Sequence, residues 1–140
     1  MKTNLNSFFK PIDDSAKWFL VLEDENNKVE VKLKPFNPAS PKAKEIMTEH
    51  YKPYARQIEK GLLKMVEKKV YTTIFVKLCV EDWKGVKLED GKLLKFSEQN
   101  AIDVFLNCEQ FLTVCLEIAQ NSENFQTLEK TDEVIELGKS

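Results

Sequence analysis

The sequence is poor in the residues that build most enzyme active sites. It contains one histidine, His50, and four scattered glycines. No GxGxxG or GxxxxGK pattern occurs, and no HExxH pattern surrounds the histidine, so neither a phosphate cradle nor a zinc-protease site is indicated. We therefore predict a protein that is not an enzyme and that has no catalytic residue, no cofactor and no metal site.

Arginine is nearly absent as well, because Arg56 is the only one, and the net charge is -2. Affinity for phosphate comes from clustered lysine and arginine, so a general nucleic-acid binder is not expected. The first half of the chain is net positive and the second half is net negative. Self-association into a homo-oligomer is therefore an alternative, although charge placed by chance on a solvated surface is the favoured interpretation.

Long apolar runs are also missing. No run approaches the roughly 20 residues that span a bilayer, and the first residues lack the apolar core of a secretory signal. We expect a cytoplasmic protein that does not enter a membrane. The three cysteines, Cys79, Cys108 and Cys115, form no CxxC pair and lie among apolar residues, so we predict reduced, buried side chains.

Four carboxylates near Trp83 could in principle bind a divalent cation; they are Glu81, Asp82, Glu89 and Asp90. They lack the DxDxDG order of a calcium loop, so we interpret them as solvated turn residues. His50 is interpreted in the same way, as a residue on a helix surface.

Alternation of apolar and charged residues predicts a β-hairpin near the N-terminus. Val29, Val31 and Leu33 alternate with charged side chains, which is typical of a strand with one buried and one solvent-exposed face. The pair Asn26-Asn27 tolerates positive φ and suits a tight turn. We expect two strands within about residues 16–35.

Helical spacing dominates the rest of the chain. Ser40 and Pro41 predict a helix start, and Pro53 should interrupt the apolar stripe that follows. The segment 70–83 is ambiguous, because its β-branched residues favour a strand and its apolar spacing fits a helix; the helical pattern before it favours the helix. Further helices are expected from Ser97, from an Asn107 cap, and over 125–137, with a loop or small hairpin from Lys84 to Lys92. We predict a mainly α fold, a helical bundle with an N-terminal β-hairpin, as one domain over residues 1–140 with its helical part at about 40–137.

A succession of residues near the middle of the chain resembles the signature of phage tail assembly chaperones. In that family a helix ends in a tryptophan, which is followed by a glycine, an aliphatic residue, a DGK-like turn and a Phe-Ser cap. The matching residues are Trp83, Gly85, Val86, Asp90, Gly91, Phe96 and Ser97. The resemblance covers about residues 70–121, lacks the proline that the family often has near position 93, and does not reach the first 40 residues.

The resemblance implies a protein of a phage or prophage that acts in the cytoplasm of the bacterial host. It implies binding to the tape measure protein, a long helical subunit, during tail morphogenesis, with tail tube protein as a further partner. The alternative is a structural tail or head-tail joining protein that remains in the virion. Candidate contact residues are Phe125 and Leu128, whereas the stripe of Met47, Tyr51, Tyr54 and Ile58 and the corner formed by Trp83 and Phe96 are interpreted as core.

Overall fold

The computed structural model describes residues 3–5, 12–37, 39–56 and 64–126, and the side chains of residues 64–66 are not among those described. The predicted hairpin is present, with β1 (Lys17–Glu23) antiparallel to β2 (Lys28–Leu33). Its turn depends on Asp24, whose carboxylate accepts hydrogen bonds from the backbone N–H groups of Asn26 at 2.9 Å and Asn27 at 2.7 Å. Neither asparagine has a positive φ, so that part of the prediction is wrong.

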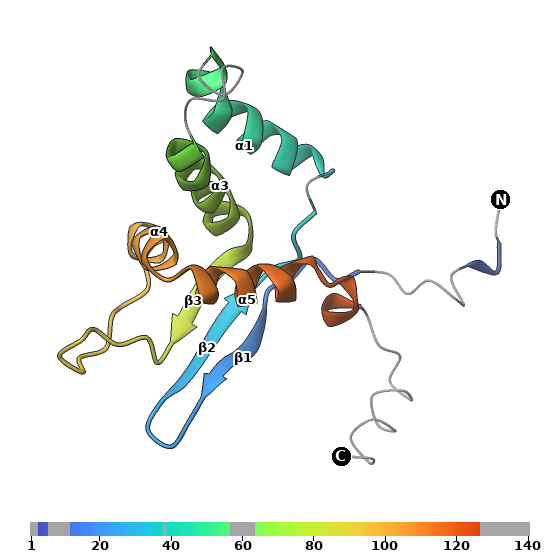
Figure 1. Ribbon diagram of the computed structural model, residues 1–140. Helices are drawn as coiled ribbons and strands as arrows, with labels where there is room; N and C mark the ends of the chain where they lie inside the picture. The colour runs from blue at the N-terminus through green and yellow to red at the C-terminus, as the bar shows by residue number, and fades with distance from the viewer. Residues whose placement is uncertain (1–2, 6–11, 38, 57–63, 127–140) are drawn as a thin grey trace.

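A third strand, β3 (Val80–Lys84), pairs antiparallel with β2 and gives the order β1-β2-β3 (Figure 1). The helix expected over residues 70–83 therefore ends early, because α3 (Lys64–Cys79) stops where β3 begins. The error has a definite cause. Val80 and Trp83 are three residues apart, which is helical spacing. A register shift in the strand leaves Glu81 without a partner on β2, so that Val80 and Trp83 both face the core.

Two of the remaining helices begin at the predicted caps, Ser40 and Ser97. Ser40 and Ser97 each accept a hydrogen bond from a backbone N–H three residues on, at 3.1 and 3.0 Å. Asn107, in contrast, is no cap: it is the last residue of its helix, and Cys108 occupies the cap position of the next one. The elements are α1 (Pro41–Tyr51), η2 (Lys52–Tyr54), α4 (Glu98–Asn107), α5 (Glu109–Gln120) and η3 (Ser122–Phe125).

Helices α3, α4 and α5 share one hydrophobic core with one face of the sheet, and α5 crosses the strands in Figure 1. The centre of that core is made by large, fully buried side chains such as Val31, Leu33, Phe75 and Phe105. Helix α1 packs on α3 instead. The prediction of a mainly α bundle is thus wrong, because the third strand converts the hairpin into a sheet and the fold into a mixed α/β architecture.

Several predictions of burial can be compared with the structure. Cys79 and Cys115 are buried as expected, but Cys108 is exposed between α4 and α5. In α1 the buried residue is Ala43, whereas Met47, Tyr51 and Tyr54 are only partly buried, and Ile58 lies outside the described residues. Within the described part of the chain, no helix has both the length and the apolar content needed to cross a bilayer.

Candidate functional site

The signature residues meet at one corner of the molecule. The indole of Trp83 is 5% exposed, and its N–H donates a hydrogen bond to the carbonyl oxygen of Leu94 at 2.8 Å. The ring of Phe96 meets it edge-on, with 5.2 Å between the ring centroids. Phe96 thus covers Trp83 as the sequence predicts, although Trp83 lies near the end of a strand and not at the end of a helix. Trp83 therefore belongs to the hydrophobic core, and Phe96 packs against it.

Gly85 is required where the chain leaves β3. Its φ is +84°, and a Cβ atom built there would lie 1.9 Å from the carbonyl oxygen of Lys28, at the start of β2. Only glycine permits so close an approach of the two backbones. Val86 follows, and its carbonyl oxygen accepts a hydrogen bond from the N–H of Leu94 at 2.8 Å.

The segment from Val86 to Leu94 forms the small hairpin that the sequence predicts. Lys87 and Leu93 form an antiparallel bridge. At the tip, Gly91 has a φ of +88°, and the carboxylate of Asp90 accepts a hydrogen bond from the N–H of Lys92 at 2.9 Å. Asp90 and Gly91 therefore shape this turn.

An apolar groove lies between this hairpin, the β1–β2 turn and the junction of α4 with α5. Its volume is about 290 Å³. Lys87 links the two turns, because its ammonium group donates to the carbonyl oxygen of Asn26 at 3.4 Å. Most of the wall is apolar and comes from Leu22, Val29, Val86, Val104, Cys108 and Phe111.

The groove is suited to side chains from another protein. Ligand pockets usually measure about 300–1,000 Å³, so this one is at the lower limit for a small molecule. Its polar lining residues are Asn27 and Lys87, and Cys108 adds a thiol. Leu22 is 53% exposed at the rim, and Cys108 is exposed too, so apolar surface is accessible there.

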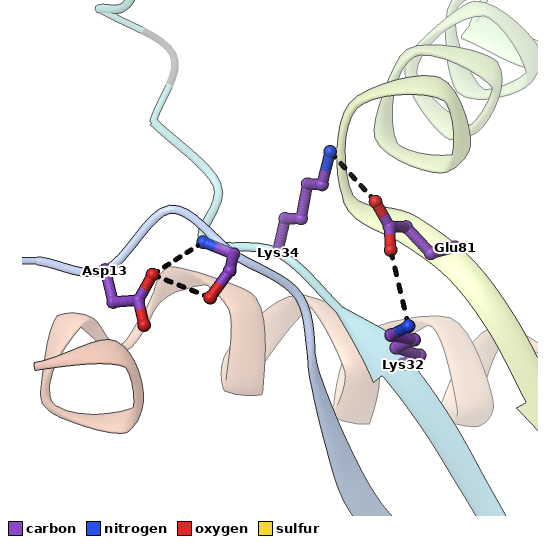
Figure 2. Close-up of polar contacts among 5 residues, drawn as sticks. Asp13, Lys32, Lys34 and Glu81 are labelled. Atoms are coloured by element: carbon purple, nitrogen blue, oxygen red, sulfur yellow. Dashed lines mark hydrogen bonds and ion pairs between the residues drawn. The ribbon is translucent and has the colours of Figure 1, made fainter.

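Three of the four carboxylates near Trp83, Glu81, Asp82 and Asp90, have partners within the protein. Glu81 lies between Lys32 of β2 and Lys34, which follows the strand, with oxygen–nitrogen distances of 3.9 Å and 2.9 Å (Figure 2). Asp82 accepts a hydrogen bond from the N–H of Trp83 at 2.8 Å. The described residues contain no group of three or more potential metal ligands.

Phe125, a predicted partner contact, is a core residue. It is fully buried, and its ring meets that of Phe19 with 5.4 Å between centroids. The carbonyl oxygen of Phe125 accepts a hydrogen bond from the N–H of Asp13 at 2.7 Å. Phe125 is therefore not accessible to a partner in this structure, and Leu128, the second predicted contact, lies outside the described residues.

The residues that line the groove escaped prediction from the sequence. Leu22, Val104 and Phe111 were read as parts of a strand and two helices, and Cys108 was expected to be buried. Leu22 belongs to the N-terminal hairpin, whereas Val104, Cys108 and Phe111 belong to a segment far along the chain. No local pattern therefore brings the two sides of the groove together. The only sequence signal at this place is the pair Gly85 and Val86 of the signature.

Comparison with known proteins gives one match. The family model described as YdaY prophage protein matches residues 37–136, which include all seven signature residues. No curated protein and no solved structure matches the chain. The match supports the prophage origin that the resemblance implied, but it does not extend to the tail assembly chaperone family. Because the match covers more than half of the sequence, the chain belongs to the YdaY prophage protein family.

Proposed function

We propose that this prophage protein is a non-enzymatic tail assembly chaperone that binds the tape measure protein in the cytoplasm of the bacterial host. The observation that carries the proposal is the apolar groove beside the signature corner. A long helical subunit exposes apolar side chains before assembly, and a partner that covers them reversibly needs an accessible apolar surface and no reactive groups.

The position of the groove supports the proposal further. Two of the seven signature residues, Gly85 and Val86, line it directly. Trp83 and Phe96 hold the adjoining strand and hairpin in place. A rigid support of this kind limits the entropy lost when a partner binds. The same groove is small, so binding can be weak enough for tail tube protein to displace the chaperone later.

The proposal can be tested by co-expression of the protein with the tape measure protein of the same prophage. We expect the chaperone to increase the soluble fraction of the tape measure protein and to co-purify with it. The Cys108→Asp variant should lose both effects, because it places a charge in the apolar groove. Its own stability should change little, because aspartate is a favourable N-cap residue for α5 while its charge is unfavourable at the C-terminus of α4, which ends at the same residue; urea denaturation of the variant checks this.

The matched control is Cys108→Ser. Serine is also a favourable N-cap, is close to cysteine in size and carries no charge, so this variant should behave as the unmodified protein does. If Cys108→Asp still solubilises the tape measure protein, the groove is not the binding site. If purified virions contain the protein in stoichiometric amounts, it is a structural component and the chaperone proposal is wrong.

A further inference from the structure

Strand β1 lies at an edge of the sheet (Figure 1). Within the described part of the chain, no other strand pairs with its outer side. The sequence of β1, KWFLVLE, contains no proline to block the edge, and the bulge that interrupts its pairing comes only after Leu20. The backbone groups on the outer side of β1 are therefore suited to pair with another strand.

Apolar side chains are exposed on both faces of this edge. Leu20 is 51% exposed and Leu22 is 53% exposed. A bulge at Val21 separates them, so that Leu20 lies opposite Glu30 while Leu22 lies opposite the buried Val29. Leu20 consequently points away from the helices and Leu22 toward them. A strand added along β1 would cover apolar area on both faces.

Acidic residues flank β1 at both ends. Asp13 and Asp14 precede it, and Glu23, Asp24 and Glu25 end it, and Lys17 is the only basic residue between positions 13 and 25 of the sequence. Lys87 approaches the turn near Asp24 and offsets part of this charge. Lys28 lies opposite Glu23 in the ladder, but its ammonium group pairs with Glu30 at 3.7 Å. The potential along the ends of this edge is therefore negative.

Hydrogen bonds keep two of these carboxylates ionised. The hydroxyl and N–H of Ser15 both donate to Asp13, at 2.6 and 2.9 Å, and they hold the pKa of Asp13 below its usual value (Figure 2). The N–H groups of Asn26 and Asn27 lower the pKa of Asp24 in the same way. An antiparallel second copy of β1 would bring acidic ends against acidic ends, which disfavours a dimer along this strand.

We propose that the outer edge of β1 binds an extended segment of another protein by strand addition, and that this segment has lysine or arginine on both sides of an alternating apolar stretch. This surface goes beyond the proposed chaperone function, because pairing along Lys17 to Leu20 leaves open the groove, which shares only Leu22 with β1. Backbone hydrogen bonds would supply affinity, and the flanking charges would select the partner. The regular part of β1, Lys17 to Leu20, is where pairing should occur.

The probe is a synthetic peptide, KKVTVTVKK, compared with its acidic counterpart, EEVTVTVEE. Binding to the full chain is followed by backbone amide chemical shifts and by titration at low salt. We expect shifts confined to residues 17–23 and their neighbours, with the basic peptide binding at least about tenfold more tightly than the acidic one, as a few exposed charge pairs allow. The preference should decrease as salt is added.

Charge reversal tests the selection directly. The double variant Glu23→Lys/Glu25→Lys should lose the preference for the basic peptide, because Asp13, Asp14 and Asp24 are then balanced by three lysines. Asp24 is left in place because it closes the hairpin turn. The matched control, Glu45→Lys/Glu49→Lys, makes the same charge change on the exposed surface of α1 and should keep the original preference.

The outcomes separate this proposal from the function proposed above. Cys108→Asp should leave peptide binding unchanged, because Cys108 lies in the groove and not on β1. The proposal is overturned if the basic peptide does not bind by about 1 mM, if both charge variants behave alike, or if the shifts occur elsewhere. Dimerisation that Leu20→Lys abolishes would also overturn it, because the occupant of the edge would then be a second copy.

Discussion

Replacing Gly85 with alanine should destabilise the protein more than any other change that adds a single methyl group to the hairpin after β3. The new Cβ atom would lie 1.9 Å from the carbonyl oxygen of Lys28 and 3.4 Å from the Cα atom of Val29. Both are backbone atoms of β2, the central strand, so they cannot rotate away as the end of a side chain can. Either β2 or the exit from β3 must shift.

The cost has two parts. Alanine at a positive φ costs about 1–2 kcal/mol, because its Cβ crowds the following carbonyl oxygen. Overpacking a well-filled site costs a further amount of about 1–3 kcal/mol. We therefore expect Gly85→Ala to lower the free energy of unfolding by about 3 kcal/mol, a large share of the roughly 5–15 kcal/mol that stabilises an ordinary domain.

Gly91 provides the matched control. Its φ of +88° is nearly the same, but no atom lies within 4 Å of the Cβ position. Gly91→Ala should therefore cost only the conformational part, about 1–2 kcal/mol. Urea denaturation measures both variants, with the midpoint reporting stability and a constant slope reporting an unchanged extent of unfolding. Equal losses in the two variants would refute the close approach of β2 to the exit of β3.

Three further predictions concern the core and the cysteines. Trp83→Phe should lower the free energy of unfolding by about 2 kcal/mol, because the carbonyl oxygen of Leu94 loses its 2.8 Å hydrogen bond and apolar area is lost, and urea denaturation would measure the loss. A thiol reagent should label one cysteine of the folded protein rapidly, and Cys108→Ser should abolish that fast phase, because Cys79 and Cys115 are buried. Burial raises the pKa of Cys79 and of Cys115 to about 12 in the folded state, from the usual thiol value of 9.0. Between these two pH values the unfolded protein loses the thiol protons and the folded protein keeps them. The free energy of unfolding should therefore fall as pH rises from about 9 to about 12, and the double variant Cys79→Ala/Cys115→Ala should show a shallower fall; an equal slope would contradict the assignment.

Local chemistry made several elements predictable. The alternation in β2 specified a strand with one buried face, and Ser40 with Pro41 specified the start of α1. Ser97 specified the start of α4. In each case the signal lies within a few neighbouring residues, because a cap or a pleat is satisfied by groups close in sequence.

The errors arose where a distant partner decided the outcome. Val80 and Trp83 have the spacing of a helix, and only pairing with β2, together with the bulge at Glu81, makes them a strand. Cysteine is among the residues most often buried, but Cys108 falls at the break between α4 and α5 and is exposed there.

The sequence by itself determined that this chain has a wet-faced hairpin, capped helices and an aromatic corner at Trp83, because propensity, capping and side-chain alternation are local. Only the tertiary structure decided that the hairpin gains a third strand, that Phe125 belongs to the core, and that a groove and an acidic strand edge exist. Those features depend on contacts between segments separated by many residues. Hydrophobic burial stabilises such contacts only when distant segments have come together in the folded chain. A short stretch of sequence therefore does not predict them.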